Sequence, residues 1–151
     1  MRVIRTGGLL VASVALATVA VGGVMAGPAF AKKPSFTCST LNGSLDTDTA
    51  TLSGCGGNTG GSGTFQPTAF ETGSGTVSWT NGASTSFSIS FKQLKKEKGC
   101  PSSAYSEYSA KGKTTADTTG SAPAGSKVKG YACVDISTGS LVNPAGKGFT
   151  I

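Results

Sequence analysis

Short segments rich in β-branched and aromatic residues recur along the chain after residue 34, and helical periodicity is almost absent there. Clusters of Gly, Asn, Asp, Ser and Pro separate these segments. The segments that predict strands are 35–38, 50–53, 76–79, 84–91, 105–114, 127–136 and 148–151. The pattern therefore predicts an all-β fold, either an antiparallel β-sandwich or a β-barrel.

The clearest predicted hairpin is the segment 76–91, in which Asn81-Gly82 supplies the turn. Its apolar residues occupy odd positions on both sides of the turn. Directly paired residues share a face of the sheet, so these residues share a face only if paired numbers sum to an even value. A two-residue loop gives odd sums, whereas a three-residue loop over 80–82 pairs Trp79 with Ala83. We therefore predict the three-residue loop.

A second alternation runs through the segment 127–136 and predicts one buried and one outer face. The predicted core positions are Val128, Gly130, Ala132, Val134 and Ile136. The residues expected on the other surface or under a loop are Lys127, Lys129, Tyr131, Cys133 and Asp135.

The first 31 residues have the three parts of a secretory signal peptide. Arg2 and Arg5 give a positive start, an uncharged apolar run follows, and the small-x-small sequence 29–31 precedes two lysines. We expect cleavage after Ala31, which divides the chain into a signal peptide, 1–31, and a single exported β domain, 32–151. An uncleaved leader that anchors the protein in a membrane is the alternative, because the apolar run is long enough to span one.

Four cysteines lie in the predicted exported part: Cys38, Cys55, Cys100 and Cys133. An even number in a small exported domain predicts two disulfides, for which three pairings exist. We favour Cys38–Cys55 with Cys100–Cys133, because each pair closes a short stretch between neighbouring strands.

Charge and composition exclude several functional classes. The chain has a net charge of +6 and 13 basic residues, but Arg2 and Arg5 are its only arginines and both lie in the leader. This argues against nucleic acid as a partner, since bidentate phosphate and guanine contacts are arginine chemistry. There is no histidine, and the cysteines are expected in disulfides. We therefore expect no metal site, no cofactor and no nucleophilic enzyme of the usual kinds.

Three groups of residues remain as candidate sites. Trp79, with Tyr105, Tyr108 or Tyr131 nearby, could form an aromatic platform for a sugar or an apolar ligand. The position of Trp79 in the alternation favours a core role instead. Glu107 stands beside two tyrosines and is the most interesting carboxylate for a glycan hydrolase. Its simpler interpretation is a surface residue on a strand.

The lysine-rich loop 92–101 is the third candidate, with Lys95, Lys96 and Lys98 as binding residues. These lysines could contact an anionic envelope polymer, or one of them could enter a trypsin-like protease as part of an inhibitor loop. The simpler interpretation is that they keep the end of the 84–91 strand soluble and discourage edge pairing.

Several segments together resemble a group of small secreted actinobacterial β-proteins. They are Cys38, Thr51 to Cys55, Val77 to Gly82, Gly99 to Pro101, and Cys133. This resemblance implies an exported, disulfide-bonded β-protein, without catalytic or binding residues. In size and two-disulfide architecture the chain also resembles the apoproteins of enediyne antibiotics, which are immunoglobulin-like sandwiches, although their cysteine spacing differs.

The sequence thus predicts an exported, monomeric, non-enzymatic protein that binds a ligand or associates with the cell envelope. An anionic envelope polymer and a small apolar ligand are the candidate partners. A protease inhibitor and a carboxylate-dependent glycan hydrolase are the alternatives.

Overall fold

Strands dominate the computed structural model, which describes residues 35–95 and 99–151. These residues belong to one compact unit, Lys32–Ile151. The strands are β1 Thr37–Ser44, β2 Thr49–Cys55, β3 Ser62–Phe65, β4 Ser74–Trp79, β5 Ser84–Gln93, β6 Ser106–Asp117, β7 Lys127–Asp135, β8 Ser140–Val142 and β9 Phe149–Thr150. One helical turn, α1 Ala69–Thr72, lies between β3 and β4.

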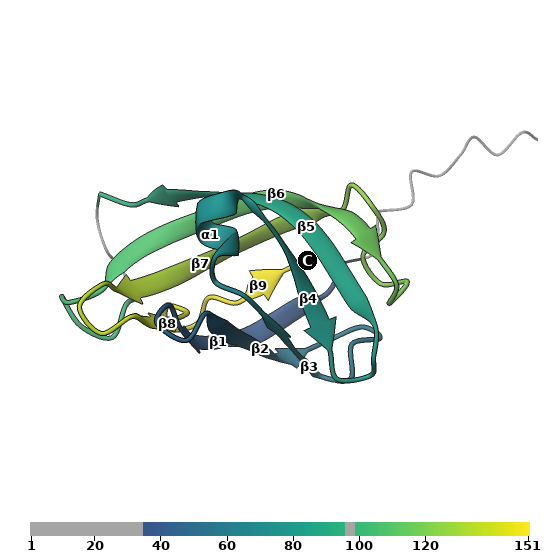
Figure 1. Ribbon diagram of the computed structural model, residues 1–151, viewed down its shortest axis with the longest axis horizontal. Coiled ribbons are helices and arrows are strands. Elements are labelled where there is room, and N and C mark those ends of the chain that lie inside the picture. The colour runs from purple at the N-terminus through teal and green to yellow at the C-terminus, as the bar shows by residue number, and fades with distance from the viewer. Residues whose placement is uncertain (1–34, 96–98) are drawn as a thin grey trace, which may run out of the picture. The chain divides into compact units, whose positions relative to one another are not determined.

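The sheet closes into an eight-stranded antiparallel β-barrel. Strands β1 to β8 follow one another around the wall, and β1 then pairs with both β2 and β8. Figure 1 shows β5, β6 and β7 on one side of the barrel and β1, β2 and β3 on the other. The sequence left a sandwich and a barrel open. The structure is a barrel, because β1 pairs on both its edges and the sheet closes on itself. A sandwich would instead consist of two separate sheets with unpaired edge strands.

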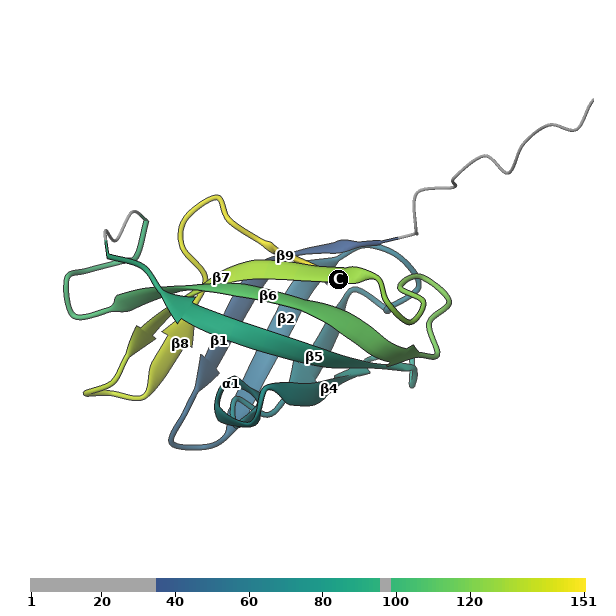
Figure 2. The same ribbon diagram turned by 90° about the horizontal axis from the view of Figure 1, so that it is seen from above.

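Two short strands share the place between β7 and β1. Strand β8 pairs with the later part of both neighbours, and β9 pairs with their earlier part. The loop 143–148 is extruded between them, and in Figure 2 it projects beside β9. The side chain of Asn143 holds this loop, since its Oδ1 accepts from the Leu41 N–H at 2.9 Å and its Nδ2 donates to the Lys147 carbonyl at 2.7 Å.

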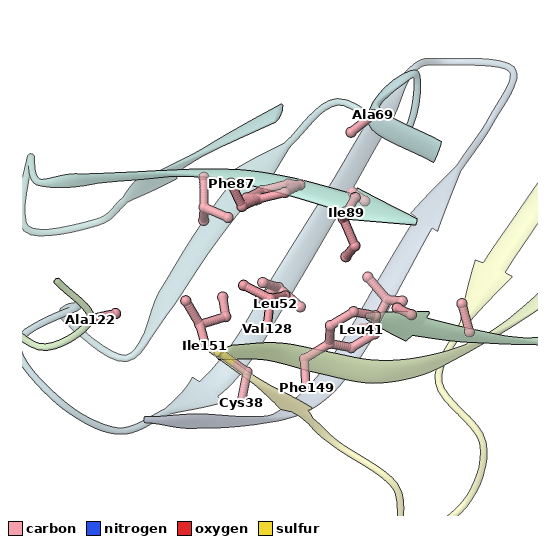
Figure 3. Close-up of a cluster of buried hydrophobic side chains, with 14 of the residues drawn as sticks. Cys38, Leu41, Leu52, Ala69, Phe87, Ile89, Ala122, Val128, Phe149 and Ile151 are labelled. Atoms are coloured by element: carbon pink, nitrogen blue, oxygen red, sulfur yellow. The ribbon is translucent and has the colours of Figure 1, made fainter. Parts of the chain in front are cut away.

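Side chains from opposite walls fill the barrel. Figure 3 shows Phe87 and Ile89 of β5 on one side of the core and Leu52, Val128 and Phe149 on the other. A void lined by these core side chains has a volume of only about 20 Å³, roughly the space of one water molecule. The barrel interior is therefore a packed core and leaves no room for a ligand.

The predicted register of the β4–β5 hairpin is confirmed. The N–H of Trp79 donates to the Ala83 carbonyl at 2.9 Å, and Val77 pairs with Thr85. The loop therefore has three residues, and Gly82 ends it with a φ of 84°, a left-handed conformation that glycine adopts without strain. Both apolar sets consequently face the barrel interior.

Both predicted disulfides are confirmed. Cys38–Cys55 joins directly paired residues of β1 and β2, and Cys100–Cys133 ties the β5–β6 loop to β7. Cys133 is fully buried, because that loop covers this part of the outer face.

The alternation predicted for 127–136 holds along most of β7 and fails at its end. Val128, Gly130 and Ala132 are buried, whereas Ile136, expected in the core, is 75% exposed. The reason is that β7 ends at Asp135, whose Oδ1 accepts from the N–H of Ser137 at 2.9 Å and starts a turn. Hydrogen bonds from the side chain and the backbone of Ser137 also lower the pKa of Asp135, whereas burial alone would raise it.

Two strands and the helical turn were not predicted. Strand β3 follows a glycine-rich connector, and β8 has only three residues. Gly63 of β3 is buried under the ring of Trp79, and a Cβ at that position would collide with the ring. The glycine that made this segment resemble a linker is what lets β3 pack beneath the only tryptophan.

The predicted signal peptide, 1–31, lies outside the described residues. Among the residues that are described, no helix combines the length and the apolar character needed to cross a membrane.

Hydrogen-bonded loops close one end of the barrel. This closed end consists of the loops 56–61, 80–82 and 118–126. The backbone N–H of Asn58 donates to Ser121 Oγ at 3.0 Å, and Asn81 Nδ2 donates to the Asn58 carbonyl at 2.8 Å. Polar side chains thus join the three loops to one another.

A chain of hydrogen bonds connects this closed end to the core. The indole N–H of Trp79 donates to Thr85 Oγ1 at 2.8 Å, and Thr85 donates to Asp117 Oδ1 at 2.6 Å. Burial raises the pKa of Asp117, but hydrogen bonds from Thr85, Ala122 and Thr119 outweigh it, so the pKa lies below its usual value. The ionised carboxylate is therefore part of the fold at this end.

Candidate functional site

The opposite end of the barrel is open and holds an apolar pocket. This mouth pocket has a volume of about 360 Å³, within the range of small-ligand sites. It is lined by Leu45, Asp48, Pro67, Thr68, Phe70, Glu71, Phe91, Tyr108, Ala132, Val134 and Ile136. These residues come from the β1–β2 turn, the α1 segment, the end of β5, the start of β6 and the end of β7.

Aromatic and aliphatic side chains form the floor of the mouth pocket. The ring centres of Phe70 and Phe91 lie 4.1 Å apart, in an edge-on arrangement. Val134 and Tyr108 are only partly buried. At the rim, Leu45 is 37% and Ile136 is 75% exposed. Large apolar side chains that remain this open to water favour a partner that covers them.

The helical turn α1 gives the pocket its shape. Strands β3 and β4 pair only at Gly63 with Trp79 and at Thr64 with Ser78, so they separate before they reach the open end. The turn α1 occupies this gap and places Phe70 against Phe91. Figure 1 shows α1 seated beside the start of β4 at this end of the barrel.

Among the described residues that line the pocket, the charged groups are two carboxylates. Asp48 accepts from the N–H of Thr68 at 2.8 Å and from the Thr68 hydroxyl at 3.3 Å, which holds the start of the α1 segment against the β1–β2 turn. Asp48 has a φ of 46°, a left-handed conformation that Asp tolerates better than most residues. Glu71 is exposed on α1. An acidic rim above an apolar floor suits a ligand with a positive end and an apolar body.

The aromatic residues predicted as a platform do not come together. Trp79 is buried, as its place in the alternation favoured, with its ring 5.3 Å from that of Phe36. Tyr105 donates its hydroxyl to Ser140 Oγ at 3.0 Å, away from the mouth pocket. Only Tyr108 reaches the pocket.

Of the predicted lysines, Lys95 is exposed, and Lys96 and Lys98 lie outside the described residues. The loop that carries them is attached to the barrel at its far end by the Cys100–Cys133 disulfide. A backbone hydrogen bond of 3.0 Å from Ala145 to the Gly99 carbonyl adds a second attachment.

The interpretation of Glu107 as a surface residue is wrong. Glu107 points outward from β6 but is fully buried beneath neighbouring segments, and its Oε1 lies 2.6 Å from Lys147 Nζ. Lys147 also sits 4.4 Å from the centre of the Tyr131 ring. This carboxylate is paired with the loop 143–148 and shielded from solvent, so it is not placed to meet a glycan.

Sequence reasoning missed most of the mouth pocket, namely Leu45, Asp48, Phe70, Glu71, Phe91 and Ile136. A weak signal existed, since Leu45 directly precedes Asp46 and Ile136 directly follows Asp135, and Asp is a common turn residue. An isolated apolar residue in a turn is common, however, so this signal becomes informative only once closure of the barrel brings the turns together.

Comparisons with family models, with curated proteins and with solved structures found no match to the chain. The functional assignment therefore depends on the geometry of the mouth pocket.

Proposed function

We propose that this protein is an exported, non-enzymatic binding protein that holds a small ligand in the mouth pocket. The ligand has an apolar body, which lies on the floor formed by Phe70, Phe91 and Val134, and a positively charged end near Asp48 and Glu71. The observation that carries this proposal is an apolar pocket of about 360 Å³ with an acidic rim, at the open end of a barrel whose interior is filled.

The size of the pocket limits the affinity. A ligand that buries about 200 Å² of apolar surface gains on the order of 5 kcal/mol at about 25 cal/mol per Å². Attraction to two partly hydrated carboxylates adds about 1 kcal/mol, and loss of ligand freedom opposes both contributions. We therefore expect dissociation constants in the range of about 10 µM to 1 mM for simple probes.

Export is the second part of the proposal. The leader sequence, the resemblance to small secreted actinobacterial proteins and the two disulfides all support an oxidising compartment. Cleavage after Ala31 would release the barrel, and an uncleaved leader would leave it tethered. N-terminal sequencing of the protein recovered from the growth medium distinguishes the two outcomes.

Three fluorescent probes test the binding site. They are a cationic styrylpyridinium, neutral N-phenyl-1-naphthylamine, and 8-anilino-1-naphthalenesulfonate, which has the rings of the neutral probe and a negative charge. We expect affinity to fall in the order cation, neutral, anion. Tightest binding of the anion would contradict the assigned role of the acidic rim.

Two variants locate the probes. Val134→Trp fills the pocket and should weaken all three probes at least tenfold, whereas Glu71→Gln should weaken only the cation, by about threefold. Thr115→Trp, which adds the same side chain at an exposed position of β6, is the matched control and should leave binding unchanged. Equal binding to the Val134→Trp and Thr115→Trp variants would place the probes elsewhere and overturn the proposal.

The enzyme alternative is tested with the same pocket. Turnover of any substrate in a panel of glycans and esters, lost in the Asp48→Asn or Glu71→Gln variant, would contradict a purely binding role.

The inhibitor alternative concerns the loop 92–101 and has a separate test. Nanomolar inhibition of a trypsin-like protease, lost on substitution of Lys96 or Lys98 by Ala, would support it.

A further inference from the structure

Five exposed lysines form one face on the outside of the barrel. This lysine face consists of Lys92 of β5, Lys111 and Lys113 of β6, and Lys127 and Lys129 of β7. Lys111 is paired directly with Lys129, and Lys113 with Lys127. Paired residues share a face of the sheet, so four of these charges form a square on two neighbouring strands.

Repulsion within the lysine face destabilises the isolated barrel. The Cβ atoms of directly paired residues lie about 5 Å apart, and like charges in that position destabilise a sheet. Within the described part of the chain, the one ion pair is Glu107–Lys147, so no carboxylate neutralises these lysines. Their direct neighbours on β5 and β6 are Ser88, Ser90 and Ser109, which are uncharged.

The acidic residues of the barrel lie elsewhere. Asp48 and Glu71 line the mouth pocket, and Asp46 and Asp135 lie at the same end of the barrel, in the β1–β2 turn and at the end of β7. Asp117 is held in the closed end, and Glu107 is buried. The two signs of charge are therefore segregated on different surfaces. A face that concentrates one sign of charge, with only hydroxyl groups between, attracts a partner of the opposite sign.

We infer that the lysine face is a second binding site, whose ligand is a linear anionic polysaccharide. The hydroxyl oxygens of Ser90 and Ser109, whose protons are donated to the carbonyls of Lys111 and Lys92, can accept hydrogen bonds from sugar hydroxyls, as can that of Ser88. At the end of the same face, next to Ser109, Tyr131 is 37% exposed and adds an aromatic side chain, with Lys147 4.4 Å from the centre of its ring. This site is independent of the mouth pocket.

Other polyanions fit this face less well. Nucleic acid is disfavoured because the described residues include no arginine, the residue that grips phosphate with two hydrogen bonds. An anionic membrane is disfavoured because the exposed large apolar side chains of the described barrel other than Tyr131 are Leu45 and Ile136, which lie at the mouth pocket instead. A surface that binds membranes combines basic residues with apolar ones that insert.

Retention on immobilised dextran sulfate, with neutral dextran of the same length as reference, tests this inference. We expect binding to dextran sulfate alone, weakening steeply with salt because each lysine contact releases bound counterions. The double variant Lys111→Gln/Lys129→Gln should weaken binding at least tenfold and make it less dependent on salt. Lys95→Gln, which removes an exposed lysine outside this face, is the control and should change binding less than twofold.

A second measurement does not require any ligand. Removing one member of a like-charged pair relieves repulsion, so Lys129→Gln should raise the thermal midpoint at low salt, and added salt should abolish the difference. The Val134→Trp variant should retain full binding to dextran sulfate, which separates this site from the mouth pocket.

Three results would overturn the inference. The first is equal retention of the wild-type protein and the Lys111→Gln/Lys129→Gln variant. The second is tighter binding to duplex DNA, or to vesicles of phosphatidylglycerol, than to dextran sulfate at the same charge concentration. The third is loss of dextran sulfate binding in the Val134→Trp variant while the protein remains folded.

Discussion

The two ends of the barrel differ in how the turns and loops that connect the strands are packed. At the closed end, polar side chains such as Ser121, Thr85 and Asp117 hydrogen-bond the loops to one another and to the core. At the open end, apolar side chains such as Leu45 and Ile136 remain exposed around a pocket. The closed end therefore contributes to stability, whereas the open end leaves apolar surface available to a ligand.

The comparison shows how one barrel divides its tasks. Polar groups at the closed end satisfy one another, so adding a ligand there would gain little. Apolar groups at the open end have no partner among the described residues that covers them, so a ligand gains free energy by burying them. Variants at the two ends should accordingly separate stability from binding.

The largest expected effect is loss of the disulfide at the closed end. Cys38 and Cys55 enclose a sequence separation of 17 residues, so the double variant Cys38→Ala/Cys55→Ala should lower the free energy of unfolding by about 3 kcal/mol. Urea unfolding followed by tryptophan fluorescence measures this change. The variant that remains folded should still bind the styrylpyridinium probe, and loss of that binding would contradict the division between the two ends.

The next effect comes from the hydrogen-bond chain below the closed end. Thr85→Val keeps the shape of a fully buried side chain but leaves the indole N–H of Trp79 without its acceptor. A buried donor without a partner costs about 2 kcal/mol. Ser86→Val, at the next and more exposed position of β5, is the control. An equal loss of unfolding free energy in both variants would show that these hydrogen bonds do not contribute to stability.

Acid should loosen the closed end through Asp117. Its pKa is lowered in the folded state, so its contribution to stability is fully present above the unfolded value of 3.8 and is lost as the pH falls through the folded pKa. Thermal midpoints between pH 2 and pH 6 measure this loss. Asp117→Asn should be less stable than wild type above pH 4, and the difference should shrink below it. A constant difference across this range would assign the effect to packing.

The smallest effect on stability is expected at the open end. Ile136 is 75% exposed, so Ile136→Ser should change the free energy of unfolding by less than about 0.5 kcal/mol. The same variant should weaken the styrylpyridinium probe about threefold, because it removes apolar area from the rim. Leu141→Ala, in the core, is the contrasting control and should cost about 3 kcal/mol. Unchanged probe binding in Ile136→Ser would exclude the rim from the site.

Local features of the fold were predictable from the sequence. The odd-numbered apolar positions and the Asn81-Gly82 turn specified the register of the β4–β5 hairpin, which is confirmed. Cysteine spacing favoured the two disulfides that form. These features depend on alternation and on short chain separations, which are visible without knowledge of the remaining strands.

Features that depend on packing between distant segments were not predictable. Strand β3 looked like a glycine-rich linker, because its pairing depends on the Trp79 ring that covers Gly63. Glu107 looked like a surface residue, because Lys147 and the loop that bury it come from a distant part of the chain. The separate alternations around Lys111 and Lys129 gave no sign that the two residues are paired.

The sequence by itself determined the class of the fold, the register of its clearest hairpin and the disulfides, because alternation, turn residues and cysteine spacing act over short distances. Only the tertiary structure decided that the sheet closes into a barrel with one polar end and one apolar end. Closure depends on which strands pair across the whole chain, and a strand's own pattern does not specify its neighbour. The mouth pocket exists because closure of the barrel brings the turns at its open end together, and the lysine face exists because β6 pairs with both β5 and β7.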